Sequence, residues 1–188
     1  DVLTRITYEY EHPDCGVRKL QEAIVNSING MIEEVCKETA VSREEIREID
    51  VAANCTMMHM LLGVDARSLG KSPYKPEFTE AKELLAHEIG IRAAEDTKLY
   101  CLPQVSAYIG ADIVAGAYVC QLWKEQGNVL FIDIGTNGEI VLANHGRLTC
   151  CSCAAGPALE GMNISSGMRA AEGAIEDVEI MEQGIRLR

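Results

Sequence analysis

Apolar residues in the first half of the chain recur at spacings that distinguish helices from strands. Between residues 17 and 36 they fall every three or four positions, which predicts an amphipathic helix. Ser42 and Glu45 have the spacing of a capping box and predict the start of a short helix. The continuous apolar run 49–53 predicts a buried strand. The chain therefore opens as alternating helix and strand.

Three more helices and one strand are predicted before this pattern ends. The first helix begins at Asn54, and its apolar face carries Met57, Met60 and Leu61. The remaining elements are a helix over 80–89, a strand over 99–102 and a long helix over 106–125. One side of the last helix carries small residues, which lets another backbone approach closely, as at a crossing between two lobes. These residues are Ala107, Gly110, Ala111, Ala115 and Gly116.

Near Gly127 the pattern changes to an antiparallel meander. Asn144, His145 and Gly146 form the turn of a hairpin. The elements predicted after Gly127 are strands over 129–133, 139–143 and 147–151, a short helix from Gly156 and a hairpin over 174–188. We therefore expect an α/β fold of two parts, residues 1–126 and residues 127–188.

The composition excludes two classes of partner. The 188-residue chain has a net charge of −12 and no stripe of basic residues, so nucleic-acid binding is not expected. No apolar run approaches the roughly 18 residues that span a bilayer, so no membrane association is expected. The eight cysteines lack the spacing of a disulfide framework and predict reduced thiols in a cytoplasmic protein. Because the first residue is Asp1, we expect the chain to be a piece of a longer protein.

The segment from Asp133 to Glu139 carries the chemistry of a phosphate-binding turn. Gly135 and Gly138 permit a positive φ and a close backbone approach, and their amides can line an anion-binding concavity. Thr136 and Asn137 add side-chain donors. Asp133 stands at the end of a strand, where a carboxylate can hold Mg²⁺ through water. The alternative is a plain turn with helpful glycines.

The residues downstream favour the phosphate-binding interpretation. The run 154–161 contains Gly156 and Gly161, which we expect to contact the nucleotide, and it follows a strand, a glycine turn, a strand and a hairpin. This order is typical of the opening of an RNase H-like lobe in actin, the sugar kinases and the heat-shock chaperones (the ASKHA class). The fold expected is thus a pair of incomplete ASKHA lobes, the end of a first lobe over 1–126 and the start of a second over 127–188.

Several segments together resemble the C-terminal domain of the reductive activators of corrinoid proteins. The matching segments are 133–140, 154–161, 164–170, 51–59 and 110–112. The chain departs from the family pattern at Ala53, where the family has Gly, and at Cys55, where it has Thr. It also carries Cys150, Cys151 and Cys153, where the family tends to have one cysteine.

The resemblance implies ATP-dependent return of an inactive Co(II) corrinoid protein to Co(I). It implies bound Mg-ATP, an iron–sulfur cluster in a separate N-terminal domain that transfers the electron, and a corrinoid protein of a methyltransferase system as partner. Only half of the nucleotide clamp is present, so we expect the 188-residue chain alone not to hydrolyse ATP. An unpaired strand edge at 49–53 makes a homo-oligomer the expected state.

Two single residues carry further hypotheses. Asp112, in the helix that resembles the one between the family's lobes, either positions the attacking water or bonds a neighbouring backbone group. Ser152 lies beside the phosphate turn and is a candidate to face a docked corrinoid and occupy a cobalt coordination position. Its alternative is a solvated or backbone-bonded serine.

Cys151 and Cys153 share one face of a strand. Two ligands on one face are too few for a zinc site.

Two rival functions remain compatible with the sequence. One is an ASKHA-type sugar or acid kinase, which requires a substrate base and a complete clamp. The other is a dimerisation or partner-docking domain without hydrolysis. Phosphoryl transfer to an added sugar or acid supports the first, and docking without a nucleotide effect supports the second.

Overall fold

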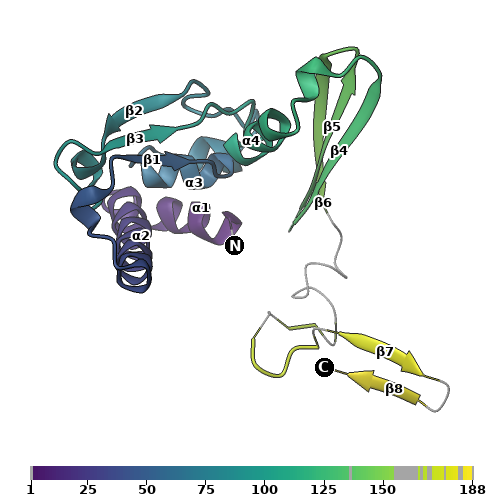
Figure 1. Cartoon of the computed structure of the whole chain (residues 1–188), viewed down its shortest axis with the longest axis horizontal. Coiled ribbons are helices and arrows are strands. Elements are labelled where there is room, and N and C mark those ends of the chain that lie inside the picture. Colours follow the sequence, from purple (N-terminus) through teal and green to yellow (C-terminus); the bar gives the residue numbers. More distant parts are fainter. Residues whose placement is uncertain are drawn as a thin grey trace.

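The structure of the chain is a computed structural model that describes residues 2–135, 137–154, 165, 167–168, 171–175, 177–181 and 184–187. It has the predicted α/β character. Helices and short strands alternate as far as α4 (Ala111–Val119), and a three-stranded antiparallel sheet follows (Figure 1). No helix among these residues is long and apolar enough to cross a membrane.

The first sheet contains β1 (Glu48–Val51), β2 (Lys82–Leu85) and β3 (Lys98–Cys101) in the order β1-β3-β2. Strand β3 runs parallel to β1 and antiparallel to β2, and Ile49, Leu99 and Leu84 form one row across the sheet. The strand predicted over 49–53 is confirmed as an element but is only half-buried, because Glu48 and Asp50 face away from the core. Among the described strands, β1 pairs on one side only, as expected for this edge.

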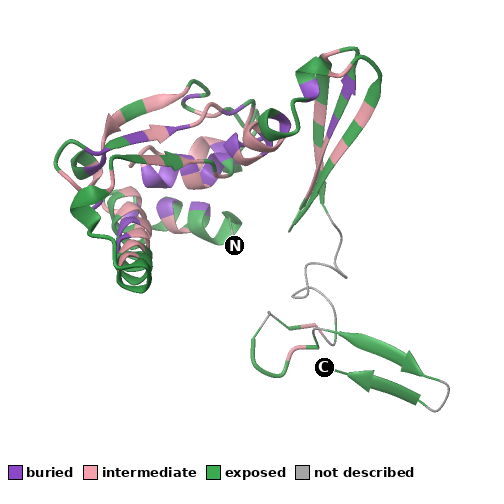
Figure 2. Cartoon of the chain, viewed as in Figure 1, coloured by how far each residue is buried: buried purple, intermediate pink, exposed green. Residues whose placement is uncertain are grey.

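Helices α1 (Val2–Glu11), α2 (Gly16–Thr39) and α3 (Cys55–Leu61) lie on one side of this sheet (Figure 1). Buried residues gather between the helices and the sheet (Figure 2). The apolar centre is made by Val25, Met58, Leu61, Ile91 and Leu99 and their neighbours. The helix predicted over 17–36 is confirmed. Helix α1 was not predicted.

Two short segments keep the local contacts that their sequences predict. The capping box at η1 (Arg43–Glu45) is confirmed, since the Ser42 backbone N–H donates to Glu45 Oε2 at 2.8 Å. Asn54 caps α3 by accepting the Met57 N–H at 2.9 Å. The predicted apolar face of α3 was wrong at one position, because Met58 is fully buried and Met57 only partly.

Two predicted helices were wrong in extent or type. The segment 80–89 forms β2 and the 3₁₀ turn η3 (Ala86–Ile89), because pairing with β3 overrides its helical spacing. The helix over 106–125 is reduced to α4 and the 3₁₀ turn η4 (Leu122–Lys124), since Gln121 has φ 51° and interrupts it. A further 3₁₀ turn, η2 (Arg67–Gly70), lies in the segment that follows α3.

The second part contains the predicted meander β4 (Asn128–Ile134), β5 (Asn137–Asn144) and β6 (Arg147–Ala154). His145 and Gly146, with φ of 47° and 77°, form its second turn. One face packs on α4 and η4, and the other leaves Leu130, Ile132, Ile134 and Leu142 exposed. The predicted hairpin within 174–188 is β7 (Val178–Met181) and β8 (Gly184–Leu187). The helix predicted from Gly156 lies outside the described residues.

Helix α4 lies between the first sheet and the meander (Figure 1), and two glycines bring it close to the β1–α3 turn and to β4. A Cβ added at Gly110 would lie 2.6 Å from Asn54 Cα, and one added at Gly116 would lie 2.6 Å from Phe131 Cζ. The small-residue side predicted for this helix therefore permits close backbone approach at Gly110, and at Gly116 it makes room for the Phe131 ring. No larger side chain fits at either contact without a shift.

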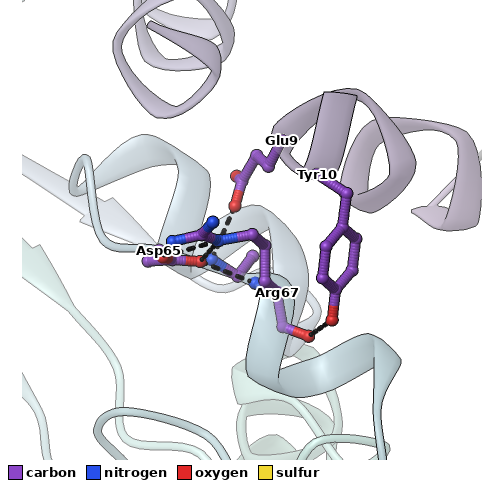
Figure 3. Close-up of polar contacts among 5 residues, drawn as sticks. Glu9, Tyr10, Asp65 and Arg67 are labelled. Carbon is purple, nitrogen blue, oxygen red and sulfur yellow. Dashed lines mark hydrogen bonds and ion pairs between the residues drawn. The ribbon is translucent and has the colours of Figure 1, made fainter. Parts of the chain in front are cut away.

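Helix α1 is attached to the loop before η2 by polar contacts (Figure 3). Glu9 is only 1% exposed, and its Oε2 accepts the Ala66 N–H at 2.8 Å, while Oε1 has no partner. Tyr10 donates its hydroxyl to the Arg67 carbonyl at 2.8 Å. Burial raises the pKa of the Glu9 carboxyl above its ordinary 4.5, against the opposing Ala66 bond, and the neighbouring Asp65 carboxylate raises it further.

We predict that Gly110→Ala destabilises the chain by roughly 1–3 kcal/mol, because its methyl group meets backbone at a site without room. Gly30, inside α2, is the matched control, since an added Cβ there meets nothing within 4 Å. Gly30→Ala should stabilise by about 0.5–1 kcal/mol through the helix propensity of alanine. Urea unfolding measures both. Equal effects of the two substitutions would contradict the close approach at Gly110.

A second prediction concerns pH. Glu9 keeps its proton to a higher pH in the folded chain than in the unfolded chain, so its contribution to stability falls as pH rises from 4.5 through the raised pKa. Glu9→Gln, which cannot ionise, should remove that fall. The measurement is the difference in unfolding free energy between the two chains at several pH values. A difference that does not change with pH would show that Glu9 ionises normally.

Candidate functional site

The predicted phosphate turn joins β4 to β5 at an exposed end of the sheet. Asp133 lies opposite Glu139, in the pair next to the one that precedes the turn, and its side chain is exposed. The Gly135 N–H donates to the Asn137 carbonyl at 2.9 Å and closes the turn. Thr136 lies outside the described residues. Asn137 is exposed, so its amide group is accessible as a donor.

The expectation for the glycines of this turn was wrong in two respects. Neither Gly135 nor Gly138 has a φ in the left-handed region, and Gly138 lies inside β5, opposite Ile134 and Cys153. The Gly135 amide, expected to face an anion, is already bonded within the turn. A Cβ added at Gly138 would lie 3.4 Å from Cys153 Sγ, which is an ordinary van der Waals distance.

A row of three polar side chains crosses the sheet next to this turn. Asp133 lies opposite Glu139, and Glu139 lies opposite Ser152 on the third strand. The Ser152 hydroxyl donates to Glu139 Oε1 at 3.0 Å. The row lies on the sheet face that packs on α4. On each strand its residue stands two positions from a residue of the apolar row formed by Phe131, Val141 and Cys150. The structure thus brings Ser152 and the phosphate turn onto one face.

The register of the two hairpins explains this arrangement. The turn at 145–146 sets Asn144 opposite Arg147, so Glu139, five residues earlier, faces Ser152, five residues later. The first turn sets Ile134 opposite Gly138 and so places Asp133 opposite Glu139. Sequence reasoning assigned no role to Glu139. Counting residues outward from the predicted three-residue turn Asn144–Gly146 would have set it opposite Cys151, and only the two-residue turn at 145–146 sets it opposite Ser152.

Asp112 lies in the first turn of α4 and is half-buried. Its Oδ1 accepts the N–H of Ile113 at 3.0 Å, and the N–H of Ala111 donates to the Ala53 carbonyl at 2.9 Å. The backbone-bonding alternative is therefore the one observed. Its charge also contributes to raising the pKa of Cys55 to about 12, after the larger effect of burial. A role for Asp112 toward nucleotide stays a prediction.

The cysteines of β6 divide between the two faces of the sheet, as their spacing predicts. Cys150 packs against the core beneath α4, whereas Cys151 and Cys153 are exposed on the opposite face. Within the described part of the chain, no group of three or more His, Cys, Asp or Glu side chains is placed to hold a metal ion. The structure gives no support for a zinc or redox-metal site at this strand.

His59 is a buried residue of α3 whose ring is held by contacts within the fold. Its Nδ1 contacts the Cys55 carbonyl at 2.8 Å, and its Nε2 accepts the Glu77 N–H at 3.1 Å. The ring stacks on Phe78 with centroids 4.6 Å apart. Burial lowers the pKa of His59, so the neutral ring with its proton on Nδ1 satisfies both contacts.

Gly156 and Gly161, predicted to contact the nucleotide, lie outside the described residues. The described part of the site consists of a tight glycine turn between antiparallel strands, an aspartate at the end of the first strand, and a helix that packs on the same sheet face. These features define the opening of an ASKHA-type lobe.

Comparison with known proteins identifies the family. The model of the RACo middle region matches residues 1–125, and the model of the C-terminal domain of RACo, the ASKHA domain, matches residues 127–188. The chain belongs to the family of reductive activators of corrinoid proteins.

Individual relatives agree with this assignment. The chain is 33% identical over 178 residues to the corrinoid activation enzyme RamQ of Eubacterium limosum. The matched residues make up 95% of this chain and 30% of RamQ. It is 38% identical over 101 residues to a [Co(II) methylated amine-specific corrinoid protein] reductase of Methanosarcina barkeri, covering 53% of this chain and 19% of that protein. A solved reductive activator for corrinoid, iron–sulfur protein superposes with a TM-score of 0.84 at 42% identity, covering 100% of this chain and 30% of that one. The chain thus spans less than a third of the length of these relatives.

Proposed function

We propose that this chain is part of an ATP-dependent reductive activator that returns a Co(II) corrinoid protein to Co(I). The observation that carries the proposal is the match to the activator family over both parts of the chain, together with the 0.84 TM-score to a reductive activator over its whole length. The names of the relatives describe activation or reduction of corrinoid proteins. No observation favours transfer of phosphate to a sugar or acid.

The phosphate turn is the part of the chain that we assign to Mg-ATP. Asp133 is exposed and forms no ion pair with any described residue, so its carboxylate suits a hydrated Mg²⁺. Asn137 offers an accessible amide donor next to it. Gly138 pairs with Ile134 and Cys153 beside the turn, in line with its neighbours in the sheet. A complete clamp also requires a second phosphate loop, which we assign to another part of the longer protein.

Hydrolysis would be coupled to electron transfer through movement of the two parts about α4. This helix contacts the β1–α3 turn through Gly110 and the meander through Gly116. A change in the phosphate turn would therefore reach the first part across a single tightly packed helix. The reductant we propose is an iron–sulfur cluster held elsewhere in the longer protein, because the described residues offer no set of cluster ligands.

Ser152 is the residue that we assign to the corrinoid. It is half-buried on the face shared with the phosphate turn, and the sheet ends two residues beyond it. A hydroxyl oxygen at this place can approach the cobalt of a corrinoid docked against the strand ends. Because the coordination of cobalt depends on its oxidation state, the contact between this oxygen and cobalt would depend on that oxidation state as well.

We predict that Asp133→Asn lowers Mg-ATP hydrolysis by at least about 100-fold in the longer protein, because the amide removes the charge that positions Mg²⁺ while keeping the shape of the side chain. Phosphate release measures the rate. Asp50→Asn is the matched control, since Asp50 is another exposed strand aspartate. Wild-type hydrolysis by the Asp133 variant would remove this carboxylate from the mechanism and leave the turn a structural one.

A further prediction tests the corrinoid assignment. Ser152→Ala should weaken the complex with Co(II) corrinoid protein or slow the formation of Co(I), which absorption spectroscopy follows. Thr149→Ala is the control, because Thr149 is an exposed hydroxyl residue of the same strand on the opposite face. Unchanged affinity and unchanged Co(I) yield for the Ser152 variant would reduce this serine to a structural role.

A further inference from the structure

The polar row beside the phosphate turn has a composition that sheet stability alone does not explain. Asp133 and Glu139 are carboxylates directly opposite each other on neighbouring strands. Like charges in such cross-strand pairs destabilise a sheet. Neither side chain has an ion-pair partner among the described residues. A pair that opposes folding and remains in place suggests a function for Glu139 as well as for Asp133.

The contact that Glu139 makes points to that function. Its Oε1 accepts the hydrogen bond of Ser152 at 3.0 Å, and both side chains are half-buried. A serine hydroxyl has one proton and two lone pairs. When the hydroxyl proton is donated in a hydrogen bond to a carboxylate, the two lone pairs of the hydroxyl oxygen remain free for another partner. A carboxylate in this role also makes the oxygen more basic, as carboxylates do behind metal-bound histidines.

We propose that Glu139 is a positioning residue that holds the Ser152 hydroxyl with its oxygen lone pairs available to the Co(II) of a docked corrinoid. The inference rests on the proposed function and deepens it. Ser152 would coordinate as a neutral hydroxyl, and its proton would stay in the hydrogen bond to Glu139, so no proton or electron is transferred in this step.

The same carboxylate connects Ser152 to the nucleotide. Glu139 has Asp133 on one side and Ser152 on the other, so the row runs from the proposed magnesium position to the proposed cobalt position across three adjacent strands. A cation that approaches Asp133 would reduce its repulsion of Glu139. The orientation of the Glu139 carboxylate, and with it that of Ser152, would then depend on the nucleotide state.

The test uses the longer activator that carries this chain and the corrinoid protein that its wild-type form reduces. Four variants are compared with wild type: Glu139→Ala, Ser152→Ala, the double variant, and Glu48→Ala as a matched control. Glu48 is an exposed strand glutamate with no side-chain hydrogen bond or ion pair to another described residue. The readouts are the electron paramagnetic resonance spectrum of Co(II) in the complex, the rate of Co(I) formation and the thermal unfolding midpoint.

We expect Glu139→Ala to reproduce the spectral change of Ser152→Ala and to slow Co(I) formation about 10-fold, the usual loss when a residue supporting a metal ligand is removed. The double variant should be no slower than Ser152→Ala alone, because both substitutions remove one interaction. The unfolding midpoint of Glu139→Ala should not fall, since the like-charge pair is relieved. Glu48→Ala should behave as wild type.

Other outcomes separate this inference from the function on which it rests. A wild-type spectrum for Glu139→Ala beside an altered one for Ser152→Ala would overturn the positioning role alone. Multiplied losses in the double variant would do the same. If Ser152→Ala leaves the Co(II) spectrum unchanged, both the cobalt contact and the role of Glu139 fall, while corrinoid activation by the wild type stands. Failure of the wild type to form Co(I) on every corrinoid protein offered, before any variant is compared, would overturn the proposed function itself.

Discussion

The register of the β4–β6 meander is the constraint on which the rest of the site depends. Two tight turns fix which residues face each other, and a slip of one residue would move every side chain to the opposite face. The register in place sends Val141 and Ala143 to the core beneath α4. The same alternation puts Asp133, Glu139 and Ser152 on that face, beyond the apolar rows. Burial of the apolar residues therefore also determines where the polar row lies.

Helix α4 extends this constraint to the first part of the chain. Its N-terminal end is held against the β1–α3 turn at Gly110, and its middle rests on Phe131 through Gly116. The two contacts leave little room for the helix to slide independently of either sheet. The position of one part of the chain relative to the other is therefore set by this single helix.

Sequence patterns located most elements, and they failed where contacts distant in the chain decide the outcome. The three meander strands, α2, and the caps at Ser42 and Asn54 follow from local spacing and turn chemistry. The segment 80–89 has helical spacing but becomes β2, because β3 offers it a hydrogen-bonded partner. Gly138 was expected to have a positive φ, yet it is a regular strand residue paired with Cys153, fifteen residues away on β6.

The sequence by itself determined the α/β class, the family resemblance and the position of the glycine turn proposed to bind phosphate, because these depend on residue type and spacing along one segment. The tertiary structure decided what each side chain of that segment contacts. In the folded chain the Gly135 N–H donates to a carbonyl within the turn, and Asp112 accepts the N–H of Ile113. The Ser152 hydroxyl donates to the carboxylate of Glu139. The Ser152–Glu139 bond joins residues on different strands and the Gly135 bond closes a turn, so only the folded arrangement determines which of these donors and acceptors meet.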